Sequence, residues 1–198
     1  MINSLSSNNF YVKIVVVHFS INMSLFSEEV NILIVIRTAT IDDAEQKGRV
    51  HYKTWKETYT GLMNSTYLDN MNVEKCINIA RKYPENTLVA DINNEIVGFA
   101  CYGQCRDNGM EEYGEIIAVY VLKDYQKQGI GKMLMEACIK KLNCYDKICL
   151  WVLNTNHNAI SFYKKLGFQF NGDEKHEILV TPIIELRMVN SINNISSL

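Results

Sequence analysis

Apolar and polar positions change period several times along the chain, and each period predicts a different kind of element. From residue 32 onward, short runs rich in β-branched residues, typical of strands, alternate with stretches whose apolar residues have helical spacing. The expected strands are 32–36, 87–91, 95–103, 115–121, 147–152, 168–171 and 183–189, and the expected helices are 40–59, 73–83, 130–142 and 157–166. Strands and helices mixed in this order predict an α/β or α+β fold around one sheet.

Some boundaries carry their own signals. Thr40 is a suitable N-cap for the first helix, and Pro84 ends the second. The pair Asn93-Asn94 suits the turn of a hairpin. The strand at 115–121 is almost continuously apolar, so we expect it to be central and buried on both faces.

The first 33 residues give the weakest pattern, and we treat them as an extension of a domain that spans 34–190. Their apolar run, 10–21, is interrupted by Lys13 and His18 and is too short to span a bilayer. We favour an extension that is dispensable for folding, with Met23 as an internal start. The alternative is an extra strand at 11–17, which is rich in β-branched residues. The Asn- and Ser-rich tail, 191–198, is expected to be loose.

After the strand at 115–121, a polar turn leads to two glycines, Gly129 and Gly131, that open an amphipathic helix. The first turn of a helix leaves its N–H groups unpaired, and together with the helix dipole they form an anion site, often for phosphate. The P-loop pattern does not fit, because Gln126 replaces its first glycine and Met133 its hydroxyl residue. The dinucleotide fingerprint does not fit either, because Leu134 replaces its third glycine.

The pattern that fits is Q/R-x-x-G-x-G/A, read as Gln126-Lys127-Gln128-Gly129-Ile130-Gly131. This hexapeptide resembles the acetyl-CoA pyrophosphate loop of the GNAT N-acetyltransferase family. A second motif of that family, N-x-x-A-x-x-F-Y-x-K-L-G-F after a strand, follows in the family's order. Its fixed positions are filled by Asn156, Ala159, Phe162, Tyr163, Lys165, Leu166, Gly167 and Phe168. The resemblance covers roughly residues 34–190.

This resemblance implies a GNAT-like acyl-CoA N-acyltransferase fold, with a single mixed, mostly antiparallel central sheet flanked by helices, and acetyl-CoA as co-substrate. Two splayed central strands would admit the pantetheine arm beside backbone groups of Val119 and Val121. The pyrophosphate would lie on Gln126, Lys127, Gln128, Gly129, Ile130, Gly131 and Lys132. Asn156 and Tyr163 would face the cofactor. Asn154 and Asn158 compete with Asn156 for this contact, and all three also suit an ordinary helix cap.

Direct acyl transfer from a thioester to an amine needs a base for the amine and an acid for the departing thiolate. Family members carry a catalytic glutamate on the strand that corresponds to 115–121, so the resemblance points to Glu115 as the base, with Glu111 and Glu112 as substitutes. Tyr163, a phenol with an ordinary pKa of about 10, would be the acid. Period-two alternation puts four residues on one face of the strand: Glu115, Ile117, Val119 and Val121. The alternative to an enzyme is a non-catalytic acyl-CoA-binding module.

Composition narrows the choice of partners. A net charge of −2 gives no basic footprint for nucleic acid, and 47% hydrophobic residues describe an ordinary globular protein. The six cysteines include no C-x-x-C pair, so we expect no metal site and a cytoplasmic protein with reduced cysteines. We expect no nucleic-acid and no membrane partner, and we leave a homodimer open.

The acceptor amine is the least determined feature. Trp55 and Tyr59 lie four residues apart on the first helix, where they would form either an acceptor wall or core packing. Small-molecule amines and protein N-terminal or lysine amines both stay open as substrates.

Overall fold

The structure is a computed structural model of the chain, and it describes residues 13–19 and 30–191. The strands are β1 (Lys13–Phe19), β2 (Val30–Thr38), β3 (Thr87–Ile92), β4 (Glu95–Gln104), β5 (Tyr113–Val121), β6 (Lys147–Leu153), β7 (Gln169–Leu179) and β8 (Thr181–Ser191). The helices are α1 (Ala44–Tyr59), α2 (Ser65–Asp69), α3 (Val73–Lys82), α4 (Ile130–Lys141) and α5 (His157–Lys165), with short 3₁₀ turns η1 (Ile41–Asp43) and η2 (Lys123–Tyr125).

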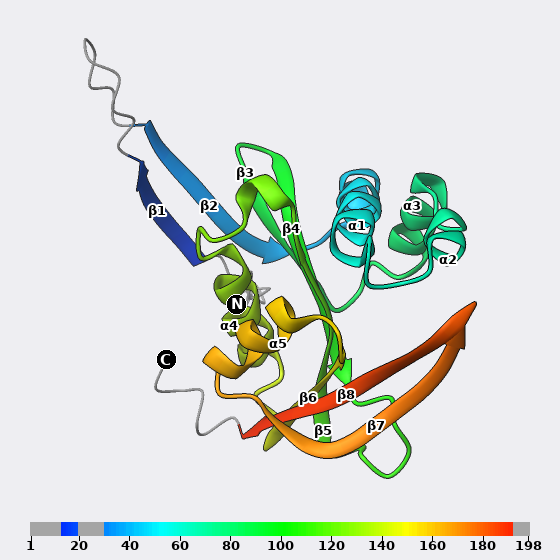
Figure 1. Cartoon of the computed structure of the whole chain (residues 1–198). Helices are drawn as coiled ribbons and strands as arrows, with labels where there is room; N and C mark the ends of the chain where they lie inside the picture. The colour runs from blue at the N-terminus through cyan, green and yellow to red at the C-terminus, as the bar shows by residue number, and fades with distance from the viewer. Residues whose placement is uncertain (1–12, 20–29, 192–198) are drawn as a thin grey trace, which may run out of the picture.

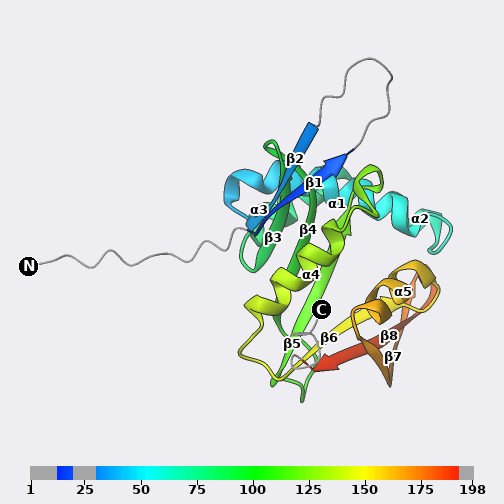
Figure 2. The same ribbon diagram turned by 90° about the vertical axis from the view of Figure 1, so that its left-hand side faces the viewer.

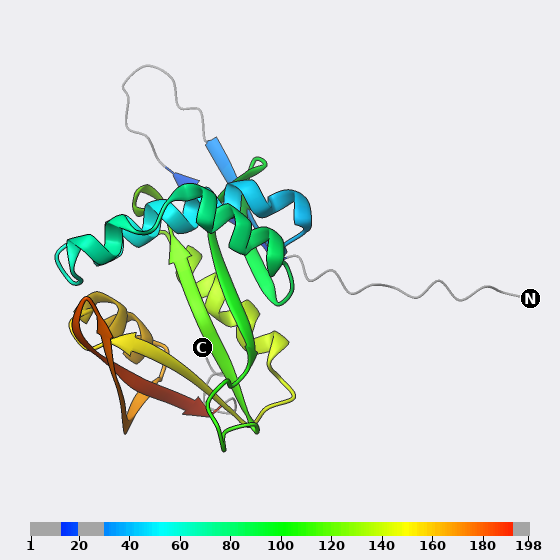
Figure 3. The ribbon, with the colours of Figure 1, turned by 90° about the vertical axis from the view of Figure 1, so that its right-hand side faces the viewer.

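The described strands form one eight-stranded sheet in the order β1-β2-β3-β4-β5-β6-β8-β7 (Figure 1). Neighbouring strands are antiparallel except for β5 and β6, which run parallel. Helices α4 and α5 lie on the face seen in Figure 2, and α1, α2 and α3 lie on the opposite face, seen in Figure 3. The expected mixed, mostly antiparallel sheet flanked by helices is confirmed.

Helix α4 is held to the sheet by the apolar stripe that its sequence predicts. Ile130, Leu134 and Cys138 are almost completely buried in the main hydrophobic cluster, against side chains of the central strands. Burying one large apolar side chain contributes about 1.5–3 kcal/mol. The stripe therefore fixes the start of α4 relative to the end of β5.

The N-terminal extension contains a strand. Strand β1 pairs antiparallel with β2, from Lys13 opposite Ile36 to Phe19 opposite Val30. The alternative interpretation, an extra strand, is therefore confirmed for residues 13–17, and the expected boundary at residue 34 falls inside β2. Residues 1–12, 20–29 and 192–198, which include Met23 and most of the tail, lie outside the described residues. That the extension is dispensable stays a prediction.

Three elements differ from the sequence-based expectation in length or existence. Strand β7 continues to Leu179, far beyond the expected end at residue 171, because its exposed residues lack an apolar alternation. Strand β8 begins at Thr181 and ends at Ser191, slightly beyond the expected range of 183–189. Helix α2 was not expected, since five residues capped by the side chain of Asn64 are too few to show a helical period.

Strand β5 is central, but it is not buried along its whole length. Gly114, Glu115 and Ile116 are buried, whereas Ile117 is 39% exposed and residues 118–121 are half-buried. The expectation of burial on both faces is wrong for this second half, because β5 loses its neighbour β6 after residue 115.

Candidate active site

The parallel strands β5 and β6 open like a V. Pairing joins residues 113–115 of β5 to 147–149 of β6 and stops there, and the strands diverge beyond this point (Figure 2). We call these paired residues the closed end of the V. Residues 118–121 of β5 and 151–153 of β6 form the open end. Backbone groups of β5 that face the opening pair with no described strand, and apart from the Val121 carbonyl, which accepts from Gln126, they are available to a ligand. The expected splayed pair of strands is confirmed.

A β-bulge lies where the V begins to open. Against β4, Cys101 pairs with Ala118 and Tyr102 pairs with Ile116, so Ile117 is an extra residue in β5. A bulge leaves its extra residue outside the ladder and re-aims the side chains that follow.

The bulge changes which residues of β5 face helix α1. Gly114 faces α4, since a Cβ there would lie 3.1 Å from the side chain of Leu142, so Glu115 points to the opposite face. After the bulge, Tyr120 faces α1, with its ring 5.4 Å from that of His51. Glu115 and Tyr120 therefore share a face. The sequence pattern predicts that Val119 and Val121 share a face of the strand with Glu115. This prediction is wrong, because after the bulge both side chains point to the opposite face.

The loop from β5 to α4 is shaped by its own side chains. The side-chain amide of Gln126 donates to the carbonyl of Val121 at 2.9 Å, and that of Gln128 donates to the carbonyl of Asp124 at 3.1 Å. Lys127 has a φ of +61°, in the left-handed region. The two glutamines of the motif therefore hold the loop in place.

Helix α4 begins with open N–H groups. Gly129, at a φ of +84°, is its N-cap without a side-chain bond, and Met133 donates to the Gly129 carbonyl at 3.0 Å. In the described part of the chain, no side chain accepts from the N–H groups of Ile130, Gly131 or Lys132. These donors and the positive end of the helix form an anion site at the open end of the V. At Gly131, a Cβ would lie 3.3 Å from the Phe162 ring.

Helix α5 begins at Asn156, whose Oδ1 accepts from the N–H of Ala159 at 3.1 Å. The cap interpretation of Asn156 is therefore confirmed, and its side-chain NH₂ donates to no described residue. Asn158 is exposed in the first turn of the same helix. Contacts of Asn156 and Asn158 with the cofactor stay predictions.

Three tyrosine phenols gather at the open end. The phenol of Tyr120 donates to that of Tyr59, and Tyr163 is electrostatically coupled to both. Burial raises the pKa of each above its ordinary value, so all three are neutral donors at physiological pH. The Tyr163 ring packs 5.3 Å from that of Phe162 and 6.2 Å from that of Phe168.

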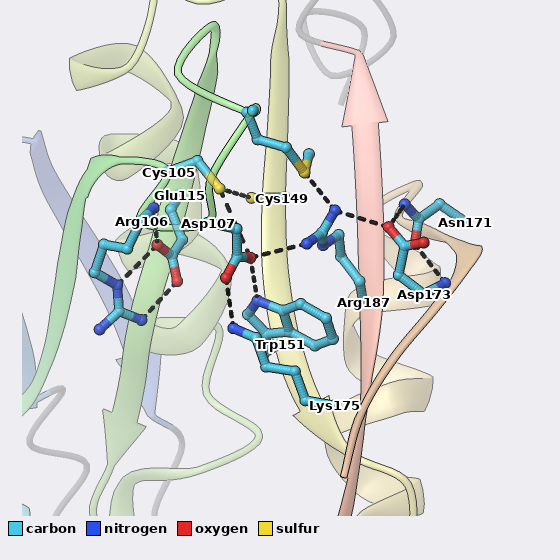
Figure 4. Close-up of polar contacts among 12 residues, drawn as sticks. Cys105, Arg106, Asp107, Glu115, Cys149, Trp151, Asn171, Asp173, Lys175 and Arg187 are labelled. Carbon is cyan, nitrogen blue, oxygen red and sulfur yellow. Dashed lines mark hydrogen bonds and ion pairs between the residues drawn. The ribbon is translucent and has the colours of Figure 1, made fainter.

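At the closed end, Glu115 is held by Arg106 (Figure 4). Its oxygens accept from the Arg106 Nε at 2.9 Å, from Nη2 at 2.6 Å and from the backbone N–H at 3.1 Å. The Glu115 side chain is 2% exposed, and hydrogen bonding to it raises the pKa of Arg106. None of the described contacts joins Glu115 to Tyr163. A carboxylate whose two oxygens both accept hydrogen bonds from one guanidinium group is poorly placed to take a proton from a substrate.

Asp107 extends this network across the sheet (Figure 4). It accepts from the Trp151 Nε1 at 2.8 Å, the Arg187 Nη2 at 2.9 Å and the Lys175 Nζ at 2.7 Å. Burial alone would raise the pKa of Asp107, but hydrogen bonds from Lys175 and Trp151 hold it below its usual value. Arg187 also pairs with Asp173 at 2.7 Å. The network therefore connects the β4–β5 loop to strands β6, β8 and β7.

The described residues contain no cluster of His, Cys, Asp or Glu that would hold a metal ion. None of their helices combines the length and the apolar character needed to cross a membrane.

Comparison with known proteins adds a family to this geometry. The model of the Acetyltransferase (GNAT) family matches residues 50–168, which span the V, the loop and helix α5. The chain belongs to the GNAT family. It is an acetyl-CoA-dependent N-acetyltransferase, and the family resemblance of its two motifs is confirmed.

Several members of this family resemble the chain over most of its length. An uncharacterized N-acetyltransferase of Bacillus subtilis is 25% identical over 74% of this chain and 86% of its own. The spermidine N(1)-acetyltransferase of Thermoplasma acidophilum is 26% identical over 74% and 95%, and the N-alpha-acetyltransferase of Sulfolobus acidocaldarius is 26% identical over 68% and 79%. The crystal structure of an N-acetyltransferase from Thermoplasma acidophilum with coenzyme A has a TM-score of 0.63, with 23% identity over 80% of this chain and 98% of that one.

Two residues of the open end were missed by sequence reasoning. Tyr120 was missed because the bulge that turns it toward Tyr59 has no sequence signature. Glu185, on β8, is electrostatically coupled to Tyr59 but belongs to neither motif.

Proposed function

We propose that this N-acetyltransferase acetylates a primary amine by direct attack on acetyl-CoA at the open end of the V. One observation carries the proposal: the Phe162 ring lies between the first turn of α4, where a Cβ at Gly131 would be 3.3 Å from it, and the ring of Tyr163, whose centroid is 5.3 Å away. The first turn of α4 suits a pyrophosphate and the phenol of Tyr163 a departing thiolate.

The residues of the loop and of β5 fit the co-substrate. Open N–H groups of Ile130, Gly131 and Lys132 would bind the pyrophosphate, with Lys127 and Gln128 in the same turn. The backbone edge of β5 that faces the opening, at Val119 and at the N–H of Val121, would bind the amides of the pantetheine arm, while the Val121 carbonyl accepts from Gln126. When bound, acetyl-CoA supplies the activated acyl group.

Tyr163 would donate its proton to the departing thiolate. Its raised pKa keeps it protonated at neutral pH, and the aromatic rings beside it fix its direction. Glu115 as the base stays a prediction. Its fork with Arg106 favours a role in holding the β4–β5 loop instead.

The acceptor is a primary amine of a small molecule or of a protein. Relatives named for spermidine and for the N-alpha position of proteins both act on such amines, and they favour these two substrate classes here. Trp55 and Tyr59, with ring centroids 4.7 Å apart, would form part of the acceptor wall beside the phenols.

A panel of amines tests the proposal. Purified protein is incubated with acetyl-CoA and each amine, and the acetylated product is followed by mass spectrometry, because the exposed Cys144 would react with a thiol reagent. We expect turnover with at least one primary amine and none with tertiary amines. Tight acetyl-CoA binding without turnover of any amine would favour the alternative, a non-catalytic acyl-CoA-binding module.

Gly129→Val tests the pyrophosphate loop. A side chain at Gly129 would project into open space beside the unpaired N–H groups, so we expect acetyl-CoA affinity to fall at least about tenfold. Gly172→Val is the matched control, because Gly172 also has positive φ and open space around it, but lies on β7. Equal acetyl-CoA affinity of both variants, measured by calorimetry, would contradict this placement.

A further inference from the structure

Glu185 occupies a defined position on β8, beside the open end of the V. It lies opposite Leu153, the last residue of β6, and opposite Lys175 of β7. Side chains directly opposite each other share a face of the sheet, and Glu185 shares its face with Arg187, two residues further on. This is the face that carries Trp151 and Asp107, and it is turned away from α5 (Figure 4).

No cation in the described part of the chain is paired with Glu185. The two cations whose charge acts on Glu185, Lys175 and Arg106, are already engaged, Lys175 with Asp107 at 2.7 Å and Arg106 with Glu115 at 2.6 Å. No described donor lies within hydrogen-bonding distance of its carboxylate. A half-buried carboxylate without a cation is costly, so its presence calls for a positively charged partner.

The neighbours of Glu185 connect it to the reacting groups. Its charge acts on the phenol of Tyr59, at the end of α1. Tyr59 is in turn bonded to Tyr120 of β5 and coupled to Tyr163 of α5. Tyr59 therefore lies near both Glu185 and Tyr163, at the same end of the V. An amine between them would reach a thioester held next to Tyr163.

Charged groups around Glu185 come from β7 and from the β4–β5 loop. Burial raises its pKa, and Glu177 on β7 raises it further, whereas Lys175 on β7 and Arg106 of the β4–β5 loop lower it. The net result is a carboxylate that holds a proton more readily than an ordinary glutamate. This property suits a group that accepts a proton from an ammonium ion.

We propose that Glu185 binds the ammonium group of the acceptor and takes its proton. The inference rests on the proposed function and names the base for it. The acceptor R–NH₃⁺ gives one proton to Glu185, and the neutral nitrogen forms a C–N bond to the acetyl carbon while the C–S bond breaks. The sulfur takes a proton from Tyr163. The nitrogen, still protonated after the C–N bond has formed, gives its second proton back to Tyr163, and the proton on Glu185 is released to water, so that one proton leaves in each turnover.

Glu115 is the competing candidate, and the structure separates the two. The carboxylate of Glu115 already accepts three hydrogen bonds from Arg106, whereas that of Glu185 accepts none from a described residue. Removing the Glu115 charge would leave Arg106 unpaired, and removing the Glu185 charge would leave no cation unpaired. The two variants should therefore fail in different ways.

The test compares Glu185→Gln, Glu115→Gln and the control Glu177→Gln. For each, kcat/KM is measured from pH 6 to pH 10 with two acceptors, spermidine and a short peptide with a free N-terminus. Acetyl-CoA affinity and melting temperature are measured in parallel. The acceptor with the higher kcat/KM in the unmodified protein identifies the source of the ammonium group.

For Glu185→Gln we expect kcat/KM at pH 7 to fall at least about 30-fold, with a raised KM, while acetyl-CoA affinity stays unchanged. The loss should shrink as pH rises, because an amine that is already neutral needs no base. That recovery should end near the ordinary pKa of the amine, about 8 for the peptide and about 10 for spermidine. In Glu177→Gln the maximal kcat/KM should stay unchanged. The acidic limb of the kcat/KM profile should move to lower pH, because the substitution removes a charge that raises the pKa of Glu185.

Three results are decisive. Wild-type kcat/KM of Glu185→Gln at every pH would overturn the inference. A uniform loss that does not recover at high pH would also overturn it, since it would show a merely structural role. If the unmodified protein binds no acetyl-CoA or turns over no amine, the proposed function itself has failed, and the inference falls with it.

Discussion

The two ends of the V use similar residue types in opposite ways. At the closed end, the carboxylates of Glu115 and Asp107 accept from arginine, lysine and tryptophan donors, so that every charge has a partner. At the open end, the start of α4 keeps free N–H groups, and Glu185 has no cation among the described residues. A saturated network stabilises a fold, whereas unsatisfied groups bind ligands.

The comparison also shows why the carboxylate that is nearer in sequence to the pyrophosphate loop need not be the reactive one. Glu115 lies on the strand that leads to the pyrophosphate loop, and sequence order makes it the first candidate. Its position at the closed end gives it a permanent cation, Arg106. Glu185 is 70 residues further along the chain, but the β6–β8 pairing brings it to the open end.

The largest effect is expected from breaking the closed end at Asp107. In Asp107→Asn, Arg187 and Lys175 lose a charged partner in a mostly buried site, and the free energy of unfolding should fall by about 3 kcal/mol. Urea unfolding measures this. The control is Asp69→Asn, which removes the exposed pair with Lys56 and should cost less than about 1 kcal/mol. Equal losses in both variants would mean that the closed end is not a stabilising network.

An intermediate effect is expected at the open end from Tyr163→Phe. The phenylalanine ring keeps the packing against Phe162 and Phe168 but cannot donate to the thiolate. Turnover should fall about 10–10³-fold, with melting temperature and acetyl-CoA affinity nearly unchanged. Tyr83→Phe, at an exposed tyrosine, is the control. If Tyr163→Phe turns over like the control, solvent protonates the thiolate and the phenol has no catalytic role.

The smallest effect concerns stability against pH at His51, between the rings of Phe99 and Tyr120. Burial, followed by the charge of Lys47, lowers the pKa of His51 to about 4, from an ordinary value of about 6.5 in the unfolded chain. The unfolded state therefore binds more protons between these values. The stability that neutral His51 contributes is present above about pH 6.5 and is lost as pH falls toward 4.

The variant His51→Phe keeps the aromatic contacts and removes the titration. Between pH 7 and pH 5 the unmodified protein should lose more unfolding free energy than the variant, by at most about 1.4 kcal/mol per pH unit. Parallel curves for the two proteins would show that His51 titrates normally in the folded state.

Much of the fold followed from the sequence because its signals are local. The stripe of α4, the Asn93-Asn94 turn and the cap at Asn156 all lie where the pattern predicts them. The loop and Tyr163 followed from motif resemblance. Their roles toward the cofactor and in catalysis stay predictions.

The rest depends on contacts between distant segments. The bulge at Ile117 reverses the facing of Val119 and Val121 without any change in apolar pattern. Two contacts join residues with no periodic relation in the sequence. One is the ion pair between Arg106 and Glu115, and the other is the pairing of β6 with β8 that positions Glu185. No single-sequence pattern encodes which carboxylate receives a cation.

The most direct test of the account is a crystal structure of the protein with coenzyme A. We expect the pyrophosphate on the N–H groups of Ile130, Gly131 and Lys132, the pantetheine arm along the open edge of β5, and the thiol within hydrogen-bonding distance of the Tyr163 hydroxyl. Coenzyme A bound away from the open end, or with its thiol far from Tyr163, would contradict it.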